Sequence, residues 1–341
     1  MLTPTIRAHV RAAARLRGFA SAASPTSLAA AVTAAPRDAL ALLAPQQGIS
    51  YTYGELDEKA RCLASGLEDV GYKSGSVAIS DIPNVAENLL LQIALSHLGA
   101  AVCTPPKDDA MLASLGEKFD IKGVICVDGS APPLSKPDAL PLVYLGLADG
   151  CRPTAGSVEF GQLLAHCPPR GSTPASTPAN VLGIYGGAPL THATALELGH
   201  AAAMQLGISP ADRVCCSVTL MHAFGIGSAV SSALVSGASV VLPAVGGIKG
   251  CGDPNQRAAV TLEVLGSTQA SVLFGDSHTL KALYQCPPPS AGQLQLRTGV
   301  VKIGSGSTFL DGVSEIPAKG DAPPTPLEYA GVKFFAMGKR A

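Results

Sequence analysis

The chain has 341 residues, of which 47% are apolar and 14% charged, and its formal net charge at pH 7 is −1. This length allows two domains or subdomains with cores of their own, and the low charge suits a densely buried protein or one covered by partners. The near-neutral balance gives no electrostatic reason to expect nucleic acid as a partner. Since no apolar run is long enough to cross a bilayer, we expect a soluble or peripherally attached protein.

The first part of the chain is basic and has no acidic side chain. Between Met1 and Arg37 the only charged residues are Arg7, Arg11, Arg15, Arg17 and Arg37. This composition, interleaved with Ala, Val, Leu and Ser, is typical of a mitochondrial or plastid presequence. We predict such a segment over residues 1–30 and favour the mitochondrion, because Arg17–Ser21 resembles a mitochondrial processing site. The alternative is an alanine-rich basic helix that packs on the protein itself.

Residues 48–104 alternate between predicted helices and strands. Helical spacing relates five apolar residues, Leu56, Ala60, Leu63, Ala64 and Leu67. A turn at Gly71–Gly75 then leads to an apolar strand at Ser76–Ser80. A second helix opens at Asp81–Asn84 and ends near Gly99, before a strand at Ala100–Thr104. This alternation predicts an α/β fold with doubly wound, mostly parallel sheets flanked by helices.

Proline clusters separate the predicted units. They lie at 131–137, 167–179 and 286–289, and we interpret them as loops between strand–helix units. We divide the chain into a first α/β subdomain over 31–180 and a second over 181–314. The remaining residues, 315–341, form a Pro-rich tail. We interpret Glu315–Pro326 as a linker or surface strap and Val332–Met337 as a candidate docking segment.

A short glycine-containing stretch begins the second predicted subdomain. From Ile184 to His192 the chain reads Ile-Tyr-Gly-Gly-Ala-Pro-Leu-Thr-His. Two adjacent glycines alone are weak evidence for a phosphate-binding loop, and they favour a simple tight turn. We expect Thr191 to cap a helix that starts at His192.

Three further segments continue the strand–helix alternation. Residues 212–242 contain a strand, a His222-Ala-Phe-Gly225 turn, a small-residue helix and a second strand. Residues 272–279 read as a strand leading into a helix. Residues 296–306 read as a strand that ends in the turn Gly-Ser-Gly.

These motifs, in this order and at this spacing, resemble the acyl-CoA synthetases and related adenylate-forming enzymes. The resemblance covers most of residues 48–306 and implies the N-terminal large-domain fold of those enzymes. In that family the stretch after Tyr185 is a Thr/Ser/Gly-rich loop with a Pro-Lys-Gly, whose amides, hydroxyls and lysine hold ATP phosphates. Here the stretch is about eight residues shorter, and between Tyr185 and Thr191 it keeps neither a hydroxyl nor a lysine.

Other elements of the family are also missing from the sequence. Nothing in residues 307–341 resembles the Tyr-Gly-x-Thr-Glu motif, the ribose-binding Asp, or the small C-terminal domain with its lysine. We therefore expect no catalytic residue and no cofactor. The resemblance places a remnant acyl and adenylate pocket at Gly186, Gly187, His222, Phe224, Gly304 and Gly306. Of these, His222 is the best candidate for a functional side chain, although it could simply fill the sheet edge beside Phe224.

Other candidate sites are weaker. His278 follows Asp276 and Ser277, but adjacent residues cannot form a catalytic triad. Nine cysteines are scattered without a Cys-x-x-Cys pair, so we expect buried, reduced thiols. No His, Cys or Asp cluster has the spacing of metal ligands, and we expect no metal site.

The sequence favours a catalytically inactive synthetase-like protein. We expect it to act as a structural accessory subunit of a mitochondrial assembly, in the matrix or on the matrix side of the inner membrane, with other protein subunits as partners. Among such assemblies we rank respiratory complex I first, then ATP synthase and the mitoribosome. Two alternatives stay open: a protein that binds or senses an acyl group, CoA or a nucleotide in the remnant pocket, and a ligase completed by a second chain.

Overall fold

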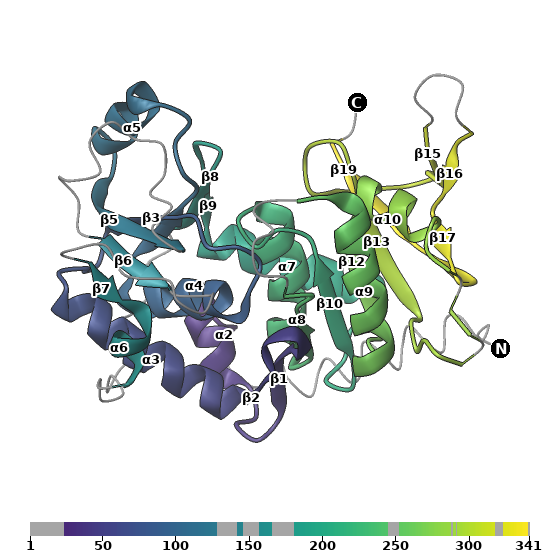
Figure 1. Cartoon of the computed structure of the whole chain (residues 1–341), viewed down its shortest axis with the longest axis horizontal. Coiled ribbons are helices and arrows are strands. Elements are labelled where there is room, and N and C mark those ends of the chain that lie inside the picture. The colour runs from purple at the N-terminus through teal and green to yellow at the C-terminus, as the bar shows by residue number, and fades with distance from the viewer. Residues whose placement is uncertain are drawn as a thin grey trace.

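Two large sheets, with helices between them and on their outer faces, make up the structure (Figure 1). The computed structural model describes residues 24–127, 142–145, 157–165, 181–244, 252–287, 289–290, 292–317 and 323–339. Two predicted proline loops, 131–137 and 167–179, lie outside these ranges, as does most of the presequence-like segment.

The first sheet has seven strands in the order β7-β6-β5-β3-β4-β8-β9. The strands are β3 (Ser76–Ser80), β4 (Ala101–Cys103), β5 (Asp120–Val127), β6 (Leu142–Leu145), β7 (Val158–Glu159), β8 (Val181–Tyr185) and β9 (Ala188–Thr191). Every neighbouring pair is parallel except β8 with β9, which form a hairpin at one edge.

The second sheet has eight strands in the order β14-β19-β13-β12-β10-β11-β1-β2. Its members are β1 (Leu40–Ala44), β2 (Ile49–Thr52), β10 (Arg213–Ser217), β11 (Ser239–Val241), β12 (Val272–Asp276), β13 (Thr298–Ile303), β14 (Thr308–Leu310) and β19 (Phe335–Gly338). Only the edge strands β2 and β14 are antiparallel to their neighbours. The predicted fold class, with mostly parallel sheets flanked by helices, is confirmed.

Helices fill the space between the sheets and cover the outer faces. The helices are α2 (Leu28–Ala34), α3 (Tyr53–Asp69), α4 (Ala86–Leu98), α5 (Asp109–Gly116), α6 (Phe160–Ala165), α7 (His192–Leu206), α8 (Ser231–Ser236), α9 (Pro254–Thr268) and α10 (Ser277–Leu283). A π-helix, η3 (Ala223–Val230), runs directly into α8, and a 3₁₀ turn, η1 (Pro45–Gln47), joins β1 to β2. One large core joins both sheets through α2, α3, α4, α7 and α8, while α9 and α10 cover the outer face of the eight-stranded sheet.

Neighbouring residues of the central strands point into different cores. On β10, Cys216 packs in the core between the sheets, while Cys215 packs in the core under α9 and α10. Phe274 and Leu273 of β12 divide in the same way. Because side chains alternate along a strand, a strand covered on both faces must be apolar at every position. This explains why these segments read as continuous apolar runs.

The helix over residues 53–69 follows the predicted pattern. All five residues of the predicted apolar face are fully buried, namely Leu56, Ala60, Leu63, Ala64 and Leu67. The helix starts with a capping box, in which the Thr52 hydroxyl accepts from the Glu55 amide while the Glu55 carboxylate accepts from the Thr52 amide. The next helix ends, as expected, at Gly99, whose φ of 69° suits glycine.

The strands do not divide between the sheets at residue 180, the predicted subdomain boundary. β1 pairs in parallel with β11, with Leu42 opposite Val240. In turn, β8 pairs with β4, with Gly183 opposite Val102. The apolar strand β1 needs a neighbour on each side, and the strand that lies beside it in space comes from much later in the chain. Order along the sequence does not reveal this pairing.

The Pro-rich tail is more structured than predicted. Two short hairpins, β15 (Glu315–Ile316) with β16 (Thr325–Pro326) and β17 (Glu328–Tyr329) with β18 (Val332–Lys333), lead to β19. This last strand lies inside the eight-stranded sheet, between β13 and β14. Since both of its edges are paired within the chain, the strand portion of Val332–Met337 has no free edge for a partner strand, and its docking role stays a prediction.

The helix α2 ties the start of the described chain to α7 and α4. The amide of Leu28 donates to His192 Nδ1 (3.3 Å), and the amide of Ala29 donates to Ser96 Oγ (3.0 Å). The predicted end of the presequence at residue 30 conflicts with this packing, because Leu28 and Ala29 belong to the core. A presequence whose removal leaves this packing intact would end before Ser27, the N-cap of α2, and the presequence itself stays a prediction. In the described part of the chain, no helix is long and apolar enough to cross a membrane.

We expect the substitution Leu28→Ala to lower the free energy of unfolding by about 3 kcal/mol, because this side chain is fully buried where α2 meets the core. Chemical denaturation followed by circular dichroism measures the change. The control is Ala34→Ser at the exposed end of the same helix, with an expected change below about 0.5 kcal/mol. Equal effects of the two variants would show that α2 is not a core element.

Candidate functional site

The two glycines of the shortened loop form a tight β-hairpin turn. Gly186 and Gly187 join β8 to β9, with Tyr185 paired to Ala188. Their φ angles are 58° and 84°, which fit the type I′ turn that two-residue hairpins prefer. The predicted tight turn is confirmed.

This turn is occupied by contacts within the protein. The amide of Gly186 donates to Thr104 Oγ1 (3.0 Å), at the end of β4. A Cβ added at Gly187 would lie 3.3 Å from Met111 Cε of α5. The amide of Gly186 is therefore engaged by Thr104, and the turn itself contributes no hydroxyl or ammonium group that could neutralise a phosphate.

Tyr185 lies beneath the hairpin with its hydroxyl in the core. The hydroxyl donates to Gln92 Oε1 (2.9 Å), and burial raises the pKa of Tyr185. Its ring runs back over β8, since a Cβ added at Gly183 would lie 2.5 Å from Tyr185 Cζ. Glycine at position 183 therefore makes room for the tyrosine ring.

Gln92 of α4 connects the hairpin to the second sheet. Besides accepting from Tyr185, it donates through Nε2 to Asn88 Oδ1 (2.9 Å) and to the Leu220 carbonyl (3.4 Å). Asn84 holds the same loop, because its Oδ1 accepts from the Leu220 amide (2.9 Å) and its Nδ2 donates to the Cys216 carbonyl (3.4 Å). These buried amides hold the loop after β10 at a fixed distance from β8.

The His222-Ala-Phe-Gly225 motif forms the start of η3. His222 Nδ1 accepts from the Phe224 amide (3.0 Å) and so caps this helix. The backbone at Gly225 passes so close to the Thr219 carbonyl that a Cβ there would collide with it. The motif therefore has a structural reason for both its histidine and its glycine, and π-helical turns are frequent at functional sites.

Lys302 is a site residue that sequence reasoning missed. It lies on β13, only 9% exposed, with Nζ 5.5 Å from the centre of the Phe224 ring and donating to the Gly306 carbonyl. Burial lowers the pKa of Lys302; burial, and to a lesser extent the Lys302 charge, lowers the pKa of His222. The available signal was a single lysine between apolar residues of a buried strand, in Val300–Ile303.

A pocket of about 240 Å³ lies between the hairpin and the start of η3. It is lined by Tyr185, Ala188, Pro189, Leu190, His222, Ala223, Gly306 and Ser307. The structure thus brings two predicted residues, His222 and Gly306, to one cavity. Phe224 is buried behind it, while Gly186 and Gly187 lie at the adjoining turn and Gly304 is exposed.

The remaining histidine predictions concern helix starts. Thr191 caps α7 as predicted, since its Oγ1 accepts from the Thr194 amide (3.1 Å). Asp276 caps α10 by accepting from the Thr279 amide (2.7 Å), and His278 is exposed. The carboxylate of Asp276 is therefore engaged at the helix start.

The described cysteines form no disulfide. Cys103, Cys126, Cys215 and Cys216 are buried, as predicted, whereas Cys62 and Cys286 are only half-buried; burial raises the pKa of Cys103 to about 11. Among the residues that the structure describes, no three His, Cys, Asp or Glu side chains are grouped so that they could hold a metal ion.

Comparison with known proteins agrees with the resemblance found in the sequence. Residues 28–107 match the family model of the AMP-binding enzymes. The 4-coumarate–CoA ligase 3 of Oryza sativa subsp. japonica is 25% identical over 225 residues, which are 59% of this chain and 38% of the ligase.

Solved structures show the same fold. An anthranilate CoA ligase in complex with anthranoyl-AMP superposes with a TM-score of 0.68 at 16% identity, over 83% of this chain and 56% of the ligase. A benzoate CoA ligase from Burkholderia xenovorans gives a TM-score of 0.62 at 17% identity, over 86% and 56% of the two chains. The resemblance to the acyl-CoA synthetases and their relatives is confirmed, and the chain covers only part of the adenylate-forming enzyme fold.

We expect His192 to make the protein less stable in mild acid. Burial lowers its pKa from 6.5 to about 4, so the unfolded chain takes up a proton before the folded one does as the pH falls. The loss accumulates from about pH 6.5 down to about pH 4 and amounts to roughly 3 kcal/mol.

Denaturation of His192→Asn at several pH values tests this expectation. Its stability should change less between pH 7 and pH 4 than that of the wild type, while the exposed control His278→Asn should follow the wild type. His222, whose pKa is also lowered, is present in all three proteins and cancels in the comparison. Parallel curves for His192→Asn and the wild type would contradict the assignment.

Proposed function

We propose that this chain, which has part of the fold of the adenylate-forming enzymes, is a catalytically inactive relative of the CoA ligases that serves as a structural subunit. The assembly we propose is a mitochondrial one, a respiratory-chain complex before others and complex I first, with the chain in the matrix or peripheral to the matrix side of the inner membrane. The relatives and solved structures that the chain resembles are CoA ligases, and the proposed loss of activity follows from the hairpin described next.

The hairpin at Gly186 and Gly187 is the observation that carries the proposal. Adenylation requires donors and positive charge that offset the developing charge on the phosphates of ATP. In this turn the amide of Gly186 is already bonded to Thr104, and Tyr185 is held inward by Gln92. Lys302 lies nearby in the fold, but its ammonium group is bonded to the Gly306 carbonyl and packed against Phe224.

Composition supports a role in an assembly. Only 14% of the residues are charged, and interface cores are depleted of charge. The basic, acid-free stretch from Met1 to Arg37 supports a mitochondrial destination. A fold that keeps its scaffold while its phosphate loop is reduced to a turn can still bind other subunits through its surface.

We expect no ATP–pyrophosphate exchange from the purified chain with any acyl or aryl carboxylate, because the hairpin leaves no cradle for the triphosphate. A working CoA ligase measured beside it shows that the assay detects exchange. The same measurement on the native assembly addresses the alternative of a ligase completed by a second chain. Exchange by the chain alone would refute the proposed inactivity.

The structural role is tested in gently solubilised mitochondria. Native electrophoresis with mass spectrometry of the bands should place the chain in a large complex, comigrating with its subunits. A pool that migrates only at the mass of the free chain would contradict the role in an assembly, whatever the outcome of the exchange assay.

The pocket supports a second candidate function, in which the protein binds or senses an acyl group, CoA or a nucleotide. The cavity of about 240 Å³ has His222 on its wall, with Lys302 behind it. Its small volume suits a short acyl or aryl group better than a whole nucleotide, since ligand pockets usually have several hundred Å³.

Calorimetry with ATP, AMP, CoA and acyl-CoA tests this second candidate. If an anionic ligand binds, Lys302→Met should weaken it by roughly tenfold or more, because a buried cation is removed. The matched control is Lys333→Met on the exposed side of β18, which should bind like the wild type. No heat at millimolar ligand would remove the candidate.

A further inference from the structure

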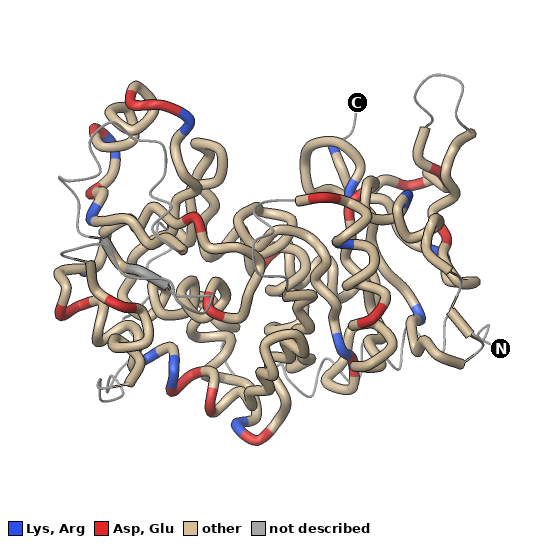
Figure 2. The backbone as a smooth tube through the Cα atoms, viewed as in Figure 1, with Lys and Arg blue, Asp and Glu red and all other residues tan. Residues whose placement is uncertain are grey.

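The outward face of α7 has almost no charge. Of the residues between Val181 and Ala211, only Glu197 is an acid or a base other than histidine. The exposed residues of the helix are Ala193, Thr194, Glu197, His200, Ala201, Met204 and Gln205. In Figure 2 the backbone over α7 and α8 is almost entirely tan.

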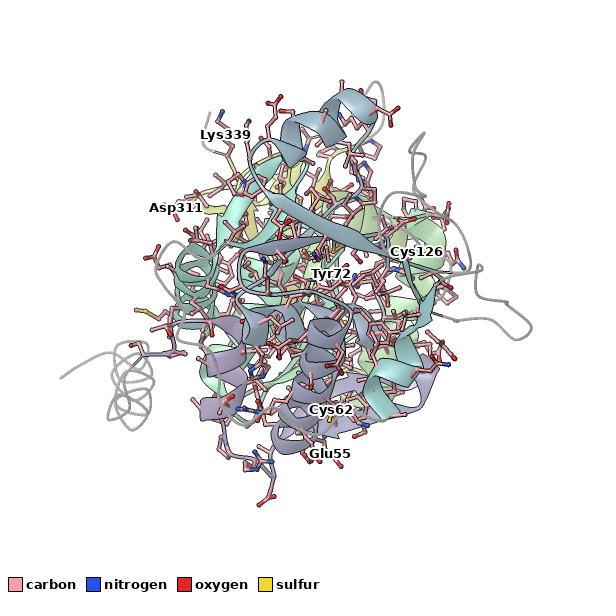
Figure 3. All side chains as sticks on the ribbon, turned by 90° about the vertical axis from the view of Figure 1, so that its left-hand side faces the viewer. Glu55, Cys62, Tyr72, Cys126, Asp311 and Lys339 are labelled. Carbon is pink, nitrogen blue, oxygen red and sulfur yellow. The ribbon has the colours of Figure 1, made fainter. Side chains whose placement is uncertain are left out.

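The comparison with α3 shows that this is not general for the molecule. The exposed residues of α3 are all charged, namely Glu55, Glu58, Lys59, Glu68 and Asp69. Figure 3 labels Glu55 at the lower margin of the molecule and shows the teal helix α7 at its left-hand margin. A helix face with almost no charge and an exposed methionine is typical of the centre of a protein interface, and a solvated face normally resembles α3.

The outward face of α7 carries a groove and, further along the helix, the exposed side chain of Met204. The groove has a volume of about 320 Å³ and is lined by Ser24, Pro25, Thr26, Ala193, Leu196, Glu197 and His200. Further along the same helix, Met204 is 71% exposed, the largest value among the exposed large apolar side chains of the described chain. Methionine is a flexible side chain that adapts to an irregular apolar groove.

Four residues on the outward face of α7 are spaced symmetrically along the helix. Ala193, Glu197, His200 and Met204 follow one another at steps of four, three and four, which places them on one stripe of the helix. When two copies of α7 pack antiparallel about a two-fold axis midway between Glu197 and His200, each Glu197 faces His200 of the other copy. The same axis places each Met204 against Ala193, at the groove of the other copy.

We propose that this face binds a second copy of the chain, through an antiparallel α7–α7 contact in which Met204 enters the groove and Glu197 pairs with His200. Such a two-fold contact uses the same patch on both copies and closes on itself. Charge complementarity favours a second copy as the partner, because its His200 and Glu197 would pair with Glu197 and His200 of the first. Within the described residues, neither side chain has an ion-pair partner in its own chain. The inference does not depend on the proposed function.

Disulfide trapping tests the register directly. In Ala193→Cys/Met204→Cys, each new thiol faces the other position on the second copy, so mild oxidation should give a covalent dimer on a non-reducing gel. The two positions are eleven residues apart on one helix, roughly 16 Å, and cannot bond within one chain. The matched control is Gln256→Cys/Ser267→Cys, with the same spacing on the exposed face of α9, and we expect it to remain monomeric.

A charge swap tests the pairing. Sedimentation of the full chain at roughly 10 to 100 µM should show a monomer–dimer equilibrium, in the range of weak complexes. Glu197→His alone and His200→Glu alone should each weaken the dimer, since like groups then face each other. The double variant should restore it, whereas a purely local effect on the helix would not be restored. Met204→Glu should raise the dissociation constant at least tenfold.

Two results would overturn the proposal. One is a wild-type chain that stays monomeric at the highest concentration, together with an Ala193→Cys/Met204→Cys variant that forms no covalent dimer on oxidation. The other is a dimer whose strength is the same in Met204→Glu, which would place the contact on another surface. All substituted positions are exposed, and thermal denaturation of each variant confirms that the fold is intact. If a charge variant unfolds, the cysteine pair and its control decide the question.

Discussion

The hydrogen bonds of Gln92 fix the position of the candidate site, because this one side chain joins elements of both sheets. It accepts from Tyr185 of the first sheet and donates to the loop that leads from β10 to His222. A buried amide that lacks a hydrogen-bond partner lowers the stability of the fold by about 1 to 3 kcal/mol. The hairpin and the loop therefore cannot move apart without leaving polar atoms unsatisfied at that cost. On the side of Tyr185, hydrogen bonds to the core therefore hold the pocket wall in place.

Local features of the sequence were sufficient for much of this arrangement. The five apolar residues of α3, the glycine at the end of α4 and the threonine before α7 each depend on neighbours within a turn of helix, and each was predicted. The short stretch at Gly186 was predicted as a turn for the same reason, since two glycines supply the positive φ angles of a hairpin. The fold class followed from the strand–helix order and from the resemblance to a known family.

Local sequence patterns could not predict the long-range features of the fold. The pairing of β1 with β11 and the insertion of β19 between β13 and β14 join segments that are distant in the chain. Lys302 was overlooked because a lysine in a strand usually points to solvent, and only the fold shows that it is buried against Phe224. The role of His222 as a helix cap also depends on a backbone geometry that no sequence pattern displays.

The position of β19 has a consequence for how the molecule is made. The eight-stranded sheet contains β1, which emerges early from the ribosome, and β19, which emerges last among its strands. Until the last strand arrives, β13 has an open edge of unpaired backbone groups, which can recruit a strand from another molecule. The sheet therefore cannot close before β19 has been made, and its open strand edge is prone to aggregation during that interval.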